Sequence, residues 1–390
     1  MKLDVSVLLK ELSKSRIVAD TQKAPSLDAL GVTKKSVCSI GEWSRAMASY
    51  GILASYIPEL KKVNKDLTAI AVGDTLGNKV VIGDGSKIKI SAQSVIKPFL
   101  YLYALESGAP AKSISGIEPT AMPFNTDRIL RPELQMKVPD HPLNNAGAIS
   151  SAGEIKDFSD FIAFMKKATG NLNLGVLENV FESEFKSNNN NRAIASRLVA
   201  SGRFKSAKEG EEAYANYTKA CSLGLTVGEV LNAAVSLSTG GLSVPEGKRI
   251  AKTGNVIRVL SAMNTYGLYE QSGLFSLMVS GSRANTAKSG VSGLIINVNP
   301  GVGAFVTYSP LLNLEGNSVY GLYAMIPLND LLALPGGMRL EEDDLNSMLV
   351  EYHREERMKV HAEIALLIHR KENPSVFRAD SKILRKLGKK

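Results

Sequence analysis

Residues 87–97 of the chain carry the sequence KIKISAQSVIK, in which a short alternating segment runs directly into a helical one. Lys87 to Ile90 alternates charged and apolar residues, which predicts a short strand. Ala92 to Ser107 has the apolar pattern of a helix and is followed by glycine and proline, which predict its end. Ser94 and Lys97 are therefore predicted to lie at the start of a helix that follows a strand.

Predicted strands lie at both ends of the chain, and predicted helices lie between them. The strands are expected at residues 67–72, 79–82 and 87–90, and again at 293–298, 304–309 and 318–325. The helices are expected at residues 40–55, 159–169, 191–201, 211–222, 227–238 and 247–263. This order predicts one sheet built from both chain ends, with a helical lobe inserted between them.

Ser94 and Lys97 are three residues apart, so on a helix their side chains share a face. A serine is a poor nucleophile until a base takes its proton. A lysine can act as that base when burial lowers its pKa towards neutrality. The backbone N–H groups at a helix start also suit a developing oxyanion. The same spacing occurs in ordinary solvated helix pairs, so the motif requires further support.

Histidine is scarce in this chain, which has only four. His141 is the one candidate for a Ser-His-Asp triad, and no nucleophile-elbow motif accompanies it. The other three, His353, His361 and His369, are spaced by eight residues, too far along a helix to share one metal. In Ser-x-x-Lys enzymes a Lys-[Ser/Thr]-Gly strand faces the nucleophile, and residues 288–290 read KSG. That strand is expected to supply a second oxyanion N–H.

The composition is that of an ordinary globular protein, with 44% hydrophobic and 22% charged residues. The formal net charge of +9 does not indicate nucleic-acid binding, because no basic stripe interleaved with aromatic residues occurs in the body of the chain. We also expect no membrane span and no signal peptide. Cys38 and Cys221 are the only cysteines and are expected as buried, reduced thiols, which favours a cytoplasmic location.

Several segments resemble one known family in order along about residues 40 to 335. They are Tyr56–Leu60, Gln93–Pro98, Glu118–Thr120, Phe124–Asn125, Asn145–Ile149, Ser183–Glu184 with Asn191, Tyr217 with Cys221–Ser222, Gly267–Gly273 and Gly316–Ser318. On these segments the chain resembles the serine-dependent glutaminases. The resemblance implies an α/β (α+β) fold of the β-lactamase-like type, with an antiparallel sheet and an inserted all-helical lobe.

The resemblance also implies hydrolysis of L-glutamine to L-glutamate and ammonia through a glutamyl-Ser94 intermediate, with Lys97 as base. Glu184 would pair with the substrate ammonium, and the N–H groups of Ser94 and Val291 would bind the oxyanion. It implies a homo-oligomer, dimer or tetramer, with no metal or organic cofactor. The implied catalytic residues are Ser94, Lys97, Tyr217 and Tyr269, and the implied substrate-binding residues are Tyr56, Gln93, Ser94, Asn145, Glu184, Asn191, Tyr217, Tyr269 and Val291.

Three features depart from the family pattern. The run Asn188–Asn191 replaces a more varied loop, which leaves Asn190 as an alternative to Asn191. The loop 280–286 is longer than usual, and Leu294 stands where a glycine is usual. We expect three regions: an N-terminal extension at 1–34, a catalytic domain at 35–335 and a charged C-terminal helix with a basic tail at 336–390. Within the catalytic domain the helical lobe is expected at 111–280, between the α/β segments 35–110 and 281–335.

Two other functions fit parts of the sequence. A catalytically silent homologue would bind an amino acid or a partner, but retention of Ser94, Lys97, Tyr217 and Tyr269 argues against it. A penicillin-recognising acyl-serine enzyme would require a Ser-x-Asn element in the helical lobe, where this chain carries the Tyr217 and Asn145 motifs instead.

Overall fold

The computed structural model describes residues 25–48, 51–55, 57–116, 125, 138–273, 275 and 286–333. They all belong to one compact unit that spans residues 1–340. The first 24 residues of the predicted N-terminal extension and the whole predicted C-terminal appendage lie outside the described residues.

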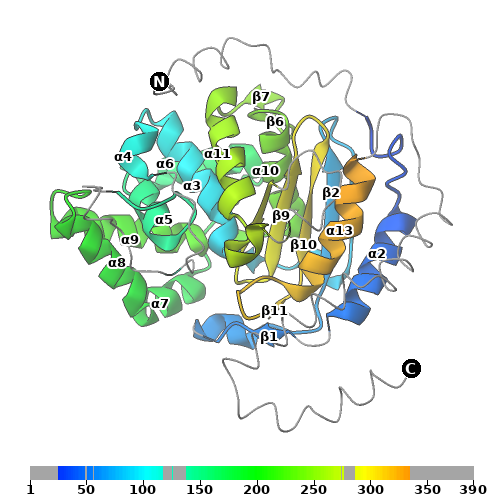
Figure 1. Ribbon diagram of the computed structural model, residues 1–390, viewed down its shortest axis with the longest axis horizontal. Coiled ribbons are helices and arrows are strands. Elements are labelled where there is room, and N and C mark those ends of the chain that lie inside the picture. Colours follow the sequence, from blue (N-terminus) through cyan, green and yellow to red (C-terminus); the bar gives the residue numbers. More distant parts are fainter. Residues whose placement is uncertain are drawn as a thin grey trace, which may run out of the picture. The chain divides into compact units, whose positions relative to one another are not determined.

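A five-stranded antiparallel sheet with the order β3-β2-β10-β9-β8 forms the centre of the fold (Figure 1). The N-terminal strand β2 lies beside the C-terminal strand β10, with Ala71 opposite Val306. The prediction of one sheet built from both chain ends is therefore confirmed. The strands are β2 Ala69–Asp74, β3 Lys79–Ile82, β8 Thr286–Ser289, β9 Leu294–Asn299 and β10 Gly303–Tyr308.

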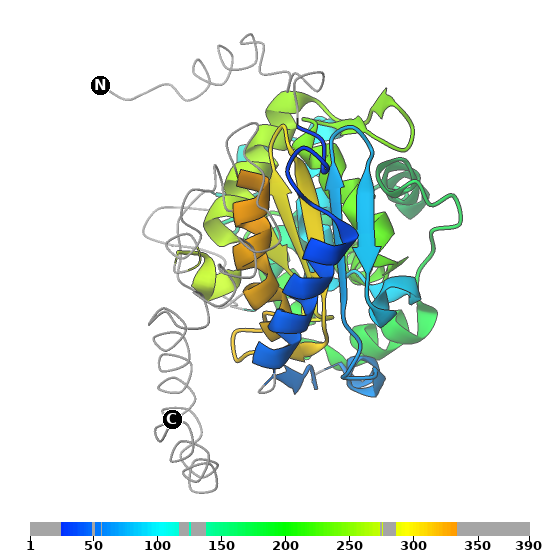
Figure 2. The same ribbon diagram turned by 90° about the vertical axis from the view of Figure 1, so that its right-hand side faces the viewer.

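Helices cover both faces of this sheet, and strands β2, β9 and β10 are buried along their whole length. Helix α10 packs on β2, β9 and β10 from one side, and α11 packs on β8. Helices α2 and α13 cover the opposite face, where Figure 2 shows them in blue and orange. The bounds are α2 Lys34–Met47, α10 Val227–Ser238, α11 Thr253–Tyr266 and α13 Val319–Ala333.

The other helices form a second group, on the left of Figure 1, in which α5 packs against α3, α8 and α9. Side-chain caps fix where several of them begin, because Asn144, Asp157 and Ser206 each accept a hydrogen bond from the first turn of α5, α6 and α9. The bounds are α4 Ala111–Ile114, α5 Asn145–Ala152, α6 Phe158–Thr169, α7 Glu178–Ser187, α8 Asn189–Ala200 and α9 Ala207–Cys221.

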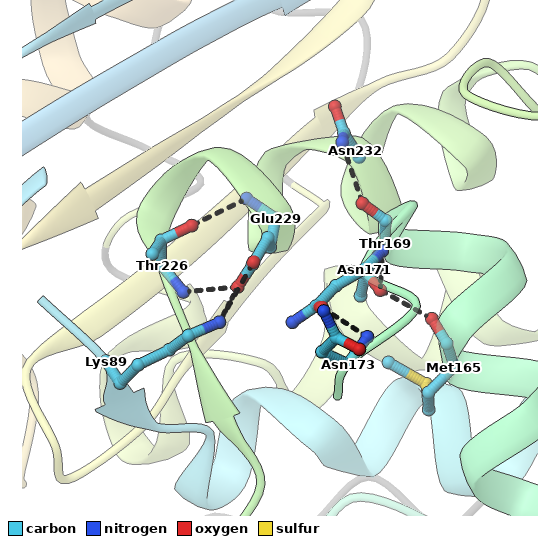
Figure 3. Close-up of polar contacts among 8 residues, drawn as sticks. All are labelled: Lys89, Met165, Thr169, Asn171, Asn173, Thr226, Glu229 and Asn232. Carbon is cyan, nitrogen blue, oxygen red and sulfur yellow. Dashed lines mark hydrogen bonds and ion pairs between the residues drawn. The ribbon is translucent and has the colours of Figure 1, made fainter. Parts of the chain in front are cut away.

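Polar contacts fix α10 against this second group of helices (Figure 3). Thr226 and Glu229 form a capping box at its N-terminus. Glu229 also pairs with Lys89 at 2.9 Å, and Asn232 Nδ2 donates to the carbonyl of Thr169 at 2.7 Å. The helix that supports the sheet is thereby linked both to the segment before Ser94 and to the end of α6.

Residues 90–106 bring the predicted nucleophile to the boundary between the sheet and the second group of helices. Strand β4, Ile90–Ser91, pairs with β5, Gly224–Leu225, which follows the end of α9. The 3-10 turn η3, Gln93–Ile96, and helix α3, Lys97–Glu106, come next. The pairing places the turn η3 beside α9, which carries Tyr217.

Short elements complete the structure at the periphery. Strand β1 pairs with β11, and β6 pairs with β7. Their bounds are β1 Ile52–Leu53, β6 Leu242–Ser243, β7 Lys248–Arg249 and β11 Leu311–Leu312, with 3-10 turns η1 Pro58–Lys62, η2 Asp84–Lys87 and η5 Tyr269–Gln271.

Three secondary-structure predictions were wrong. The expected strand at 87–90 is only β4, which lies outside the main sheet. The expected strand at 318–325 is the first half of α13, whose buried position allows β-branched and aromatic residues in a helix. The helix expected at 40–55 begins at Lys34 and ends at Met47. Helices α4, α5 and α7 were not predicted, and β8 was expected only through its Lys-Ser-Gly motif.

Candidate active site

Ser94 lies in the turn η3, and Lys97 is the first residue of α3. Both side chains are buried, with Ser94 5% and Lys97 0% exposed. Gln93, immediately before the serine, has a φ of 45°. This left-handed backbone costs a non-glycine residue about 1–3 kcal/mol and persists only where the surrounding structure holds it. The turn that presents Ser94 is therefore fixed by its neighbours.

The amide of Asn145 joins Lys97 to Tyr217. Its Oδ1 accepts hydrogen bonds from Lys97 Nζ at 2.6 Å and from the Tyr217 hydroxyl at 3.2 Å. Burial lowers the pKa of Lys97 to about 8, against the opposing effects of Cys221 and Glu184. Roughly a tenth of such a lysine is neutral at pH 7 and more as the pH rises, so it can accept a proton.

Glu184 of α7 places a buried carboxylate close to the nucleophile turn. It is 2% exposed, and one of its oxygens accepts a hydrogen bond from Gln93 Nε2 at 3.0 Å. Burial raises the pKa of Glu184 to about 7, and the hydrogen bond from Gln93 and the charge of Lys97 oppose this shift. Among the described residues no lysine or arginine forms an ion pair with it. A cationic group of a ligand would stabilise the ionised carboxylate.

Asn191 lies beside Asn145, and Asn190 does not. Asn191 is 1% exposed, and its Oδ1 accepts a hydrogen bond from Asn145 Nδ2 at 2.8 Å. Its own Nδ2 is buried and has no partner among the described residues. Asn190 is exposed and donates to the carbonyl of Asn125 at 2.7 Å. An unpaired buried N–H donor is costly, so Asn191 Nδ2 is suited to an anionic ligand group.

The end of strand β8 faces the backbone of the nucleophile turn. A Cβ atom at Gly290 would lie 3.3 Å from Ser94 N and 3.2 Å from Val95 N, so the two backbones are in close contact. The next residue, Val291, is 3% exposed and packs with Ile57 and Leu60. Val291 therefore follows directly on the residue that lies against the backbone of the Ser94 turn.

Tyr269 approaches the nucleophile from the turn η5. Its φ is 58°, and Gln93 is the other described non-glycine residue with a positive φ. The Tyr269 hydroxyl donates to the carbonyl of Ser289 at 3.0 Å. Burial raises the pKa of Tyr269, and a hydrogen bond with Ser94 acts in the opposite direction. The two strained residues of the described chain therefore flank Ser94 from different segments.

Tyr56 lies outside the described residues, as do residues 280–285 of the long loop. His141 is buried, stacks on the Tyr266 ring at 4.0 Å and accepts a hydrogen bond from Leu143 N at 3.2 Å through Nδ1. Burial lowers the pKa of His141 to about 3, and the charges of Lys97 and Lys288 add to this. Its role in the fold is structural.

Sequence reasoning missed two residues that support this cluster. Asn144 caps α5, and its Oδ1 accepts a hydrogen bond from Gly147 N at 2.7 Å, which fixes the helix start that carries Asn145. Lys288 is fully buried beside the Tyr269 ring. The Asn-x-x-Gly spacing could have indicated the cap, and the Lys-Ser-Gly motif pointed to Lys288 without giving its side chain a role.

Comparison with known proteins places this cluster in a family. The family model for glutaminase matches residues 51–334. The chain belongs to the glutaminase family. It is 33% identical over 304 residues to the glutaminase of Clostridium tetani, covering 76% of this chain and 97% of the relative. It is 35% identical over 274 residues to that of Colwellia psychrerythraea, covering 68% and 85%.

Solved glutaminase structures share the fold. One named "Probable glutaminase ybaS" is 30% identical, with a TM-score of 0.70 over 78% of this chain and 97% of that one. Another, Mglu in its glutamate form, is 26% identical, with a TM-score of 0.68 over 76% and 67%. The β-lactamase-like architecture and the assignment to the glutaminases as an enzyme, both predicted above, are confirmed. Among the described helices, none combines the length and apolar character needed to cross a membrane.

Proposed function

We propose that this glutaminase hydrolyses L-glutamine to L-glutamate and ammonia through a glutamyl-Ser94 ester, with Lys97 as the base. The observation that carries the proposal is the hydrogen-bonded set formed by Lys97, Asn145 and Tyr217 behind a buried serine. Family membership supports the reaction, and the lowered pKa of Lys97 supports its role.

The substrate would be held at its α-amino acid end by Glu184 and Asn191. The Glu184 carboxylate would pair with the ammonium, and the unpaired Asn191 Nδ2 would donate to the carboxylate. Asn145, with its second N–H, and Tyr56 would complete the carboxylate site. Gln93 would hold Glu184 in register with the nucleophile beside it. The solved structure of Mglu in its glutamate form supports an amino acid site in this fold.

The reaction would proceed in two steps at Ser94. The Ser94 oxygen attacks the side-chain amide carbon of glutamine while Lys97 Nζ takes the hydroxyl proton, and the N–H groups of Ser94 and Val291 hold the oxyanion. The intermediate collapses when Tyr217 gives its hydroxyl proton to the departing nitrogen and takes one back from Lys97, which releases ammonia. A water molecule then loses a proton to Lys97 and attacks the ester, and Ser94 leaves with that proton as glutamate is released. Tyr269 would orient the Ser94 oxygen in both steps.

The rate of glutamine hydrolysis is expected to rise with pH across the pKa values of the two buried groups Glu184 and Lys97. Glu184 binds the substrate ammonium when it is ionised, above about 7, and Lys97 accepts a proton when it is neutral, above about 8. The profile of kcat/KM against pH should therefore climb across this interval. Glu184→Gln should lose the contribution of Glu184 and keep that of Lys97, shifted to lower pH because the charge of Glu184 raises the pKa of Lys97 in the wild type. A wild-type rate that falls as the pH rises through the interval would contradict both assignments.

Asparagine is expected to be hydrolysed much more slowly than glutamine. Because Glu184 fixes the ammonium, a substrate that is one methylene shorter leaves its amide carbon short of Ser94. Ammonia release from both amino acids, measured at matched concentrations, tests this directly. Asn190→Ala is the control, because its exposed side chain should change neither rate. Equal turnover of the two amides would show that Glu184 does not set the register.

We also propose that the chain is a homo-oligomer in the cytoplasm and that residues 35–335 form its catalytic domain. Cys38 is half-buried and Cys221 is buried, and both are free in the structure, which supports the location. Light scattering of the purified protein tests the oligomeric state.

A further inference from the structure

Lys288 is a buried lysine that the reaction described above does not use. It lies on β8, is 0% exposed and forms no ion pair with a described residue. Its Nζ donates to the carbonyl of Ser289 at 2.6 Å and to that of Gly267 at 3.3 Å. The same nitrogen lies 4.3 Å from the centroid of the Tyr269 ring. Burying a charged amine without a carboxylate partner is costly. The two carbonyl oxygens and the Tyr269 ring take the place of that carboxylate.

The carbonyl of Ser289 is the point where Lys288 meets the active site. It accepts two hydrogen bonds, one from Lys288 Nζ and one from the Tyr269 hydroxyl. Tyr269 is held at a φ of 58°, so its position depends on such contacts. The amine therefore holds this tyrosine at two places, at the ring face directly and at the hydroxyl through the shared carbonyl.

The same carbonyl belongs to the peptide group that enters the oxyanion segment. The N–H of that peptide is at Gly290 and donates to the carbonyl of Leu294 at 2.8 Å. Gly290 contacts the Ser94 backbone, and Val291 follows directly. Fixing both ends of the Ser289–Gly290 peptide thus fixes how the Val291 N–H approaches the nucleophile.

We propose that Lys288 is a positioning residue that holds the Tyr269 ring and the Ser289 carbonyl and thereby sets the geometry of Ser94 and of the Val291 N–H. The inference rests on the proposed function and deepens it. The side chains that interact electrostatically with Lys288 are Lys97, Cys221 and His141, and none of them is a carboxylate. Lys288 therefore has no acidic partner among them that would make it a simple structural ion pair.

Lys288→Met, which keeps length and removes the amine, should lower kcat about 10–100-fold with a much smaller change in KM, as for other supporting-shell residues. Thr286→Val is the matched control, because Thr286 is buried on the same strand and donates to the carbonyl of Val298, away from Tyr269. It should lose stability and keep kcat. An equal fall of kcat in both variants, or a wild-type kcat in folded Lys288→Met, would overturn the proposal.

A double-mutant cycle separates positioning from general destabilisation. Lys288→Met and Tyr269→Phe act on the same carbonyl, so their effects on kcat should be strongly non-additive. Additive effects would mean that Lys288 does not act through Tyr269.

NMR of labelled tyrosine rings gives a readout that does not depend on turnover. The Tyr269 signal is assigned as the one that is missing from the spectrum of Tyr269→Phe. This signal should shift in Lys288→Met, whereas the signal of Tyr103, which packs on Phe161, should not. An unmoved Tyr269 signal would refute the inference even in an inactive enzyme. Failure of the proposed function would instead appear as absent glutamine hydrolysis in the wild type.

Discussion

Ser94→Ala is expected to abolish glutamine hydrolysis while leaving the fold intact. The side chain is buried, and the small change leaves the hydrogen bonds between Lys97, Asn145 and Tyr217 in place. By comparison with other acyl-enzyme hydrolases, loss of the nucleophile should lower kcat on the order of 10⁵–10⁶-fold. Ammonia release under saturating glutamine, with circular dichroism as the check on folding, provides the measurement.

Lys97→Met should be nearly as damaging, and the double variant should be no worse than either single one. The two residues act as one unit, so their effects do not add. Ser113→Ala is a suitable control, because its hydroxyl is exposed and donates only to the carbonyl of Pro110. Substantial activity in Ser94→Ala would exclude the covalent mechanism. If the fold-losses of kcat in the two single variants multiplied in the double variant, Lys97 and Ser94 would act independently.

Tyr217→Phe is the second change with a large expected effect. Its hydroxyl shares Asn145 Oδ1 with Lys97, whose Nζ lies 5.9 Å from the centroid of the Tyr217 ring. A hydroxyl in this position can pass a proton between the base and the departing ammonia. Its loss should lower kcat on the order of 10²–10⁴-fold, with a smaller effect on KM.

Tyr214 provides a matched control for that experiment. It lies on the same helix, is fully buried and donates to the carbonyl of Phe185 at 3.1 Å, away from the cluster of Lys97 and Asn145. Tyr214→Phe should lower the free energy of unfolding by about 1 kcal/mol and leave kcat unchanged. If Tyr217→Phe lowered kcat no more than Tyr214→Phe, Tyr217 would have no part in proton transfer.

The sequence predicted the elements of the fold where local signals were strong. Strand β3 and helix α10 lie where they were expected, because the turn residues before the strand and the apolar stripe of the helix agree with their surroundings. The first half of α13 was taken for a strand because its valine and tyrosine residues favour strands in isolation. Its burial against the sheet and α2 decides its helical state, and that packing is not visible in a local window.

In the site too, local motifs could be predicted from the sequence, whereas contacts between distant segments could not. Motif spacing indicated Ser94 and Lys97, and the family resemblance implied Glu184. Neither indicated the hydrogen bond from Gln93 to Glu184, which joins residues far apart in the chain. The strained backbones of Gln93 and Tyr269 were also invisible, since nothing in a glutamine or a tyrosine signals a positive φ. The choice between Asn190 and Asn191 rested on spacing alone, and the burial of Asn191 now favours it.

The pairing of β2 with β10 has a consequence for biosynthesis. Ala71 and Val306 lie opposite each other although more than 200 residues separate them. Ser94 leaves the ribosome early, whereas Val291 and the strands that support it leave near the end of the described chain. Nascent chains therefore contain the proposed nucleophile long before its proposed oxyanion partner exists, so we expect hydrolysis to begin only after the strands that support Val291 have been synthesised. Premature termination anywhere in the helical middle should release chains that lack activity altogether.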